Sequence, residues 1–154
     1  MSEDYYQEVA DKFIFTVKKG LLYTENDVWI DLRNGKAKIG VTDFLQRRGG
    51  DVVFVDILKK GSAIKRLDEI ASYETIKAVM PVTSPLNGVI AEINTLVNEK
   101  PELINEDPYG EGWLALISPS NLEEDKKQLI SAEKYFELMK SKIKDEMGKN
   151  KKEA

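Results

Sequence analysis

One lysine of this chain stands between two runs of strand-forming residues. Glu69–Tyr73 and Val79–Thr83 have the composition of strands, and the second run ends at the turn signal Ser84-Pro85. Lys77 is therefore expected at or near the tip of an exposed hairpin. An amine on a four-carbon stem can be acylated there by a modifying enzyme, which replaces a hydrated charge by a neutral amide carrying the transferred group. Most surface lysines only keep a protein soluble, so the residues around Lys77 must show whether it is a modification site.

The composition argues against autonomous catalysis. The chain contains neither cysteine nor histidine, which removes thiol nucleophiles, the commonest zinc ligands and the one side chain that titrates near neutral pH. Any redox or group-transfer chemistry would then belong to an attached cofactor, while the protein supplies orientation and shelter. We therefore expect a non-catalytic carrier that binds no metal.

The charge and hydropathy exclude two classes of partner. The net charge is −4, from 23 basic and 27 acidic residues, so there is no electrostatic case for nucleic-acid binding. No apolar run approaches the ~20 residues of a membrane span. The N-terminus, Met1–Asp4, is acidic where a presequence would be basic. The sequence predicts a cytoplasmic protein without a nucleic-acid or membrane partner.

Short strand-forming runs dominate from Leu21 onward. Asn34-Gly35 predicts a tight hairpin turn, because both residues tolerate positive φ. Thr42 can cap a short helix that Gly49-Gly50 can end. A stretch containing Pro101 and Pro108 is expected to be extended. The runs with strand composition, besides the two around Lys77, are Val28–Leu32, Ala37–Val41, Asp51–Ile57, Val89–Asn94 and Gly112–Ile117.

The two ends of the chain carry helical patterns. Ser2–Lys12 can form a short amphipathic helix. Ser120–Glu123 has the form of a capping box, and Ser131 can cap a helix whose apolar residues recur at helical spacing. Without a Gly- or Ser-rich linker, we expect one domain. Its parts are an N-terminal extension (1–20), a β domain (21–118), a helical segment packed on it (119–148) and a basic tail (149–154).

Three blocks within residues 21–139 resemble the H-protein of the glycine cleavage system, a lipoyl carrier. The order of the blocks and the length of the third make the resemblance specific. The blocks are Ile39–Phe44 with Gly50–Val55, then Glu74, Lys77 and Ala78 with Ser84-Pro85, and finally Leu103–Leu114. In this third block, Asn105 and Asp107 can satisfy loop amides near the lysine turn.

The resemblance implies a mainly β fold with flanking helices: a β-sandwich of the lipoyl-domain type (a barrel-sandwich hybrid) with a C-terminal helix. It also implies that Lys77 carries lipoate in amide linkage, attached by a lipoate ligase or lipoyl transferase. Glu74 would help that enzyme recognise the turn, and Ala78 completes the binding motif. Biotin is the competing cofactor, but biotinylated lysines usually have methionine on both sides, whereas Ile76 and Ala78 flank Lys77.

The resemblance further implies a swinging arm. The lipoate would carry an aminomethyl intermediate from glycine decarboxylase to an aminomethyltransferase and would then be reoxidised by dihydrolipoyl dehydrogenase. The carrier itself needs no catalytic group, and we expect a monomer.

The chain departs from the family's pattern just before Trp29. The family usually has a histidine and an acidic or polar residue there, whereas this chain reads Asn26-Asp27-Val28. This departure keeps an alternative open: an H-like lipoate-binding protein that carries sulfur intermediates for a heterodisulfide-reductase-like, sulfur-oxidising complex. A lipoate relay protein, which passes lipoate to other enzymes, is a further alternative.

Overall fold

The computed structural model of the chain describes residues 4–153. The strands are β1 (Tyr5–Ala10), β2 (Phe13–Lys18), β3 (Leu22–Tyr23), β4 (Val28–Arg33), β5 (Lys36–Val41), β6 (Val52–Ile57), β7 (Ala63–Ile64), β8 (Glu69–Thr75), β9 (Val79–Thr83), β10 (Gly88–Ile93), β11 (Ala115–Pro119) and β12 (Ile130–Ser131). The helices are α1 (Asp43–Gly49), α2 (Leu96–Glu99), α3 (Leu103–Glu106), α4 (Leu122–Lys126) and α5 (Ala132–Glu153).

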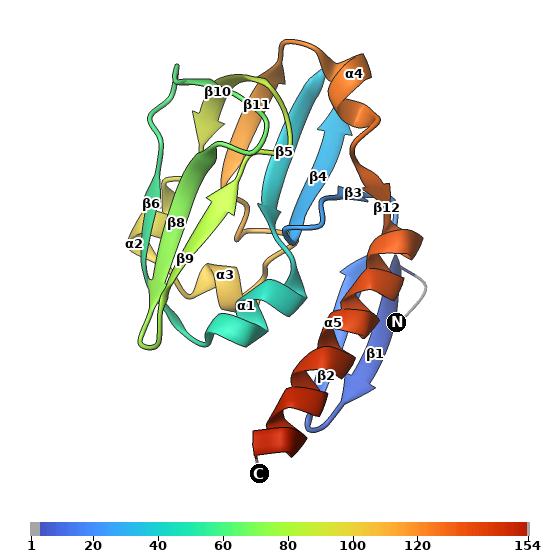
Figure 1. Cartoon of the computed structure of the whole chain (residues 1–154). Helices are drawn as coiled ribbons and strands as arrows, with labels where there is room; N and C mark the ends of the chain where they lie inside the picture. The colour runs from blue at the N-terminus through green and yellow to red at the C-terminus, as the bar shows by residue number, and fades with distance from the viewer. Residues whose placement is uncertain (1–3, 154) are drawn as a thin grey trace.

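Two antiparallel sheets enclose the main core. One has the strand order β12-β3-β4-β5-β11-β10-β7, and the other has the order β6-β8-β9; Figure 1 shows them facing each other. Ile30 and Ile39 of the larger sheet and Ile70 and Val82 of the smaller one belong to the same buried cluster. The predicted β-sandwich with a C-terminal helix is confirmed.

Local turn chemistry positions the larger sheet. Asn34 and Gly35 both have positive φ, 52° and 74°, and they join β4 to β5 as their sequence predicts. Gly40 lies opposite Trp29 in the β4–β5 pair, and a Cβ there would come within 2.6 Å of the Trp29 ring. The indole N–H of Trp29 donates to the Pro108 carbonyl at 2.9 Å. Glycine thus allows the ring to lie flat across β5 and reach the distant loop.

The N-terminal extension is a hairpin, so the helix expected over Ser2–Lys12 is wrong. Ser2 itself lies outside the described residues. β1 and β2 pair antiparallel from Tyr5 opposite Lys18 to Ala10 opposite Phe13. The Tyr6 ring stacks on Phe136 of α5 at a centroid distance of 5.1 Å. Strand pairing and this long-range contact override a local helical spacing, which short sequences satisfy by chance.

The stretch expected to be extended between β10 and β11 instead contains α2 and α3. Asn94 stabilises the start of α2 by accepting a hydrogen bond from the Leu96 N–H at 3.1 Å, and Pro101 precedes α3. Gly112 is needed for the tight return, since a Cβ there would lie 2.5 Å from the Leu103 carbonyl oxygen. The prolines therefore bound short helical turns in a compact loop.

The C-terminal helix packs on the N-terminal hairpin. Ser131 caps α5 as predicted, its hydroxyl accepting from the Lys134 N–H at 3.2 Å. Tyr135, Met139 and Ile143 share a second buried cluster with Phe15. The helix continues to Glu153, so it extends through residues 149–153 of the expected basic tail. Within the described residues, no helix combines the length and apolarity needed to cross a bilayer.

One expected cap does not form. The residue before α4 is Asn121, and it makes no side-chain capping bond. The capping box expected over Ser120–Glu123 is therefore wrong, because the helix starts one residue later than that pattern requires.

Candidate functional site: the Lys77 turn

Lys77 lies at the tip of the β8–β9 hairpin, as predicted. The two strands pair from Glu69 opposite Thr83 to Glu74 opposite Val79, and the turn between them is the lower left extremity of Figure 1. The Thr75 N–H closes the turn by donating to the Ala78 carbonyl at 2.9 Å. Lys77 is exposed. Its amine is therefore presented to solvent from the end of a paired ribbon.

Thr75 holds the turn from within. Its hydroxyl oxygen accepts from the backbone N–H groups of Lys77 at 3.2 Å and Ala78 at 3.1 Å, although the side chain is largely buried. The hydroxyl thus binds two turn amides at once. Sequence reasoning missed this role, but a threonine two residues before an exposed turn residue is a recognisable signal of a side-chain-stabilised turn.

The end of α1 lies beneath the turn. A Cβ on Gly49 would stand 3.4 Å from Thr75 Cγ2 and 3.6 Å from Met80 Cγ. The helix is fixed at its start by Thr42, whose hydroxyl accepts from the Leu45 N–H at 3.3 Å, and ends at Gly50 with φ of 83°. Both ends agree with the sequence prediction. The C-terminal end of α1 therefore supports the turn from below through its contact with Thr75 and Met80.

The long third block supports the same region. Asn105 accepts from the Val52 N–H at 2.9 Å, and its amide donates to the Gly50 carbonyl and to Gln46, both at 3.0 Å. Asp107 accepts from the Glu111 N–H at 2.9 Å within the loop itself. Both side chains bind backbone amides as predicted, but only Asn105 does so beside the link between α1 and β6, whereas the Asp107 bond stays within its own loop. Asn105 thereby ties the α3 segment to the link between α1 and β6.

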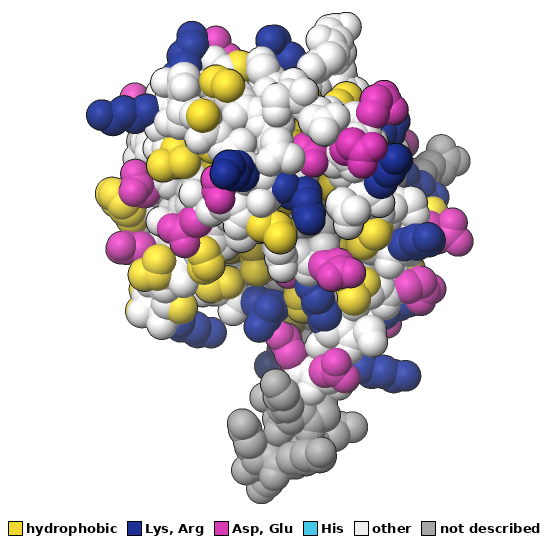
Figure 2. Space-filling view, turned by 45° about the horizontal axis from the view of Figure 1, so that its top comes forward, with side chains coloured by type: hydrophobic (Ala, Val, Ile, Leu, Met, Phe, Trp, Pro, Cys, Tyr) yellow, Lys and Arg dark blue, Asp and Glu magenta, His cyan; other side chains and the backbone are white. Residues whose placement is uncertain are grey.

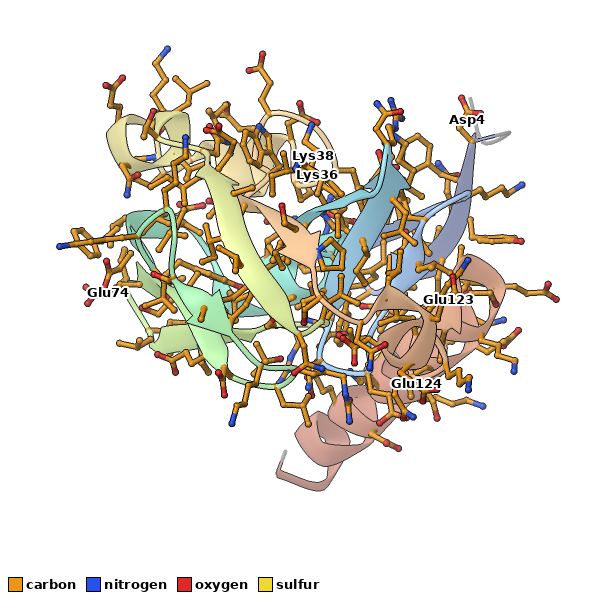
Figure 3. The ribbon with its side chains drawn as sticks, turned by 90° about the horizontal axis from the view of Figure 1, so that it is seen from above. Asp4, Lys36, Lys38, Glu74, Glu123 and Glu124 are labelled. Carbon is orange, nitrogen blue, oxygen red and sulfur yellow. The ribbon has the colours of Figure 1, made fainter. Side chains whose placement is uncertain are left out.

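Glu74 and Ala78, the other predicted site residues, flank the tip. Glu74 is exposed at the end of β8, and Figure 3 shows it on the opposite side of the molecule from Glu123 and Glu124 of α4. Ala78 is also exposed and contributes its backbone to the turn. The structure thus brings Glu74, Lys77 and Ala78 together at one end of the smaller sheet.

A second polar cluster lies where the resemblance leads one to expect a histidine. Asp27 has φ of 67° and is buried. Its carboxylate accepts from the Tyr135 O–H at 2.6 Å and from Lys142 Nζ at 3.0 Å, and the hydroxyls of Tyr135 and Thr42 are 2.8 Å apart. Burial, reinforced by the charge of Asp27, raises the pKa of Tyr135 well above its usual value. This cluster fastens α5 to the turn before β4.

Comparison with known proteins decides the family. A family model described as "Glycine cleavage H-protein" matches residues 21–142. This chain belongs to that family. The probable glycine cleavage system H protein of Pyrococcus abyssi is 41% identical over 128 residues, which cover 82% of this chain and 95% of the relative. Glycine cleavage system H protein 4 of Aquifex aeolicus is 35% identical over 147 residues, which cover 94% and 81%.

A solved H-protein has the same fold. The crystal structure of a glycine cleavage system H protein from Mycobacterium marinum aligns with a TM-score of 0.68 at 30% identity, covering 75% of this chain and 92% of that one. The family match confirms the resemblance predicted from the sequence. The H-protein family consists of lipoyl carrier subunits. The family model begins after β1 and β2 and ends within α5, whereas the alignment with the Aquifex aeolicus relative covers 94% of this chain.

Proposed function

We propose that this H-protein is a lipoyl carrier whose lipoate is joined by an amide bond to Nζ of Lys77. The observation that carries the proposal is the exposed position of Lys77 at the tip of β8–β9, on a turn held by the Thr75 hydroxyl. When bound, lipoate supplies a disulfide that accepts and releases groups by thiol–disulfide chemistry. The chain contributes a fixed attachment point that stands clear of the sheet.

The site residues fit this attachment. The turn leaves the lysine stem free to extend, and the small side chain of Ala78 leaves room beside it. Glu74 places a carboxylate three residues before the amine, which a lipoate ligase or lipoyl transferase can recognise through a basic side chain. The proposed cargo is an aminomethyl group, carried among glycine decarboxylase, aminomethyltransferase and dihydrolipoyl dehydrogenase.

Two measurements test this function in order. Intact mass after treatment with a lipoate ligase, lipoate and ATP should show one added lipoyl group, and Lys77→Arg should show none. The lipoylated protein should then support glycine-dependent exchange of labelled bicarbonate with a glycine decarboxylase. Wild-type protein that stays unmodified, while a known carrier is modified by the same ligase, would refute the proposal.

The cluster around Asp27 motivates a second candidate. Asp27, buried and paired with the partly exposed Lys142, stands where the family usually has a histidine. This difference favours an H-like protein that carries sulfur intermediates for a heterodisulfide-reductase-like complex. Lipoylated protein that fails the bicarbonate exchange with the decarboxylase of its own organism would support this candidate. Transfer of its lipoyl group to a second carrier, followed by mass, would instead indicate a lipoate relay.

A further inference from the structure

The outer face of the smaller sheet carries an apolar row beside Lys77. Phe54 of β6 lies opposite Glu74 of β8, and Glu74 lies opposite Val79 of β9. Residues directly opposite one another in antiparallel strands point to the same side of the sheet. Phe54 is 54% exposed and Val79 is 62% exposed. These two side chains therefore flank the Glu74 carboxylate on a face that is open to solvent.

A β-bulge enlarges this row. The register of β6 against β8 shifts between Val52 and Phe54. As a result Val53 and Phe54, although consecutive, are both exposed, while Val52 and Val55 on either side of them are buried. A regular strand would have turned Val53 inward. We call the surface formed by Val53, Phe54, Glu74 and Val79 the Phe54 face.

The Phe54 face combines apolar area with negative charge. In the adjoining turn, Ile76, next to Lys77, is 88% exposed. The next row across the sheet, Asp56 opposite Ser72, adds a second exposed carboxylate. Figure 2 shows hydrophobic, acidic and basic side chains intermingled on the side of the molecule where this sheet lies. Contiguous exposed apolar groups of this kind mark interaction sites, and the carboxylates require a basic side chain from the partner.

We propose that the Phe54 face is the docking surface for the enzyme that attaches lipoate, a proposal that rests on the function proposed above. Attachment forms a bond between Nζ of Lys77 and the lipoyl carboxyl carbon. The amine loses a proton, and the activating group, AMP in a ligase that uses ATP, leaves the acyl carbon. The enzyme must bring that carbon to bonding distance of Nζ, at the end of a four-carbon stem. Its surface must therefore cover the turn.

The geometry selects the outer face among the surfaces around the turn. The inner side chains of β8 and β9, such as Ile70, Tyr73 and Val82, are buried in the sandwich core, and Thr75 rests on the end of α1. The Phe54 face is the exposed side of the same three strands.

The test is the rate of lipoylation. With lipoate, ATP and a lipoate ligase, kcat/KM should fall about tenfold or more for Phe54→Ser, as for loss of a buried aromatic contact in an interface. Val79→Ser should show a smaller loss, and Phe54→Leu should recover most of the rate. Phe13→Ser is the matched control, because Phe13 is 48% exposed in β2, outside the Phe54 face. Circular dichroism and thermal unfolding establish that each variant is folded.

The outcomes separate this inference from the function on which it rests. Equal rates for wild type, Phe54→Ser and Phe13→Ser would overturn the inference while the carrier function stands. A wild-type chain that is never lipoylated would refute the function itself. Each variant can also be driven to complete lipoylation and tested in the bicarbonate exchange. Normal exchange supports a surface specific to attachment, whereas normal attachment with lost exchange would assign the face to the decarboxylase.

Discussion

The Lys77 turn and the Asp27 cluster both combine a lysine with hydroxyl groups, but the turn exposes its lysine whereas the cluster pairs its lysine with a buried carboxylate. At the turn, one threonine hydroxyl fixes the backbone and leaves the lysine exposed. In the cluster, the charged groups of Asp27 and Lys142 are paired with each other, and the Asp27 carboxylate is buried. A covalent attachment site, the role proposed for the turn, needs a fixed but open backbone, whereas a helix anchor needs a buried, fully satisfied network.

This contrast makes a general prediction about substitutions. Changes of the exposed side chains at the turn should alter chemistry and leave stability unchanged, because these side chains contribute little buried area; Thr75, which is buried beneath the turn, should affect both. Changes in the cluster should alter stability and leave attachment unchanged, because α5 packs on β1 and β2, outside the smaller sheet. The following experiments test this separation, from the largest expected effect to the smallest.

Replacing the attachment residue should have an all-or-none effect. Lys77→Arg should abolish lipoylation, since the guanidinium does not form this amide, while the free energy of unfolding should change by no more than about 0.5 kcal/mol. Intact mass and urea denaturation measure the two quantities. Lys59→Arg, at an exposed lysine beyond the end of β6, should change neither. Residual modification of Lys77→Arg would show that another lysine is the site.

Removing the buried charge should have the reverse pattern. Asp27→Asn keeps a residue that tolerates positive φ but leaves Lys142 without its counter-charge, which should lower the free energy of unfolding by about 2 kcal/mol. Asp31→Asn is the matched control: Asp31 is itself partly exposed and its partner Arg33 is mostly exposed, so loss of this pair should make little difference to stability. Lipoylation of folded Asp27→Asn should match wild type, and a slowed attachment would break the proposed separation.

Removing the Thr75 hydroxyl, which we call the Thr75 clamp, should have an intermediate effect. Thr75→Val keeps the shape of the side chain but removes the acceptor for the Lys77 and Ala78 amides. It should cost about 1 kcal/mol of stability and reduce the lipoylation rate severalfold, since the lysine is no longer held at a fixed position. Thr75→Ser should retain both properties. A normal rate for Thr75→Val would mean that the strand pairing alone fixes the turn.

The smallest effect concerns alkaline pH. Burial raises the pKa of Tyr23 and Tyr73 above the usual value of 10.0. As the pH rises above 10, tyrosines of the unfolded chain lose protons while these two keep theirs, which favours the unfolded state. Urea denaturation should therefore give constant stability up to about pH 10, apart from other groups, and a decline above it. Tyr73→Phe should show a shallower decline; an identical slope would contradict this assignment.

Sequence reasoning succeeded where local chemistry decides the structure. Asn34-Gly35 fixes its turn through positive φ, and Thr42 and Ser131 cap their helices through single hydrogen bonds. It failed over Ser2–Lys12, where the outcome depends on pairing with β2 and stacking on α5. No spacing within eleven residues reveals a partner so far along the chain.

At the candidate site too, features that depend on local sequence were predicted and features that depend on distant contacts were not. Lys77 was placed at a hairpin tip because strand composition and Ser84-Pro85 are local signals. The meeting of Gly49 with Thr75 was not predicted, because it joins a helix end to a strand end through the fold. The outward position of Val53 also escaped prediction, because a bulge exists only relative to the neighbouring strand.

The Thr75 clamp has a consequence for transport. A tether anchored on a loose loop would spread its cargo over the volume explored by both the loop and the arm. A fixed pivot removes the loop's share of that volume, so the effective concentration of the cargo at any docking site within reach of the arm is higher. On the proposed function, one hydroxyl group, bonded to two amides, would thereby help to determine how often the cargo reaches its next enzyme.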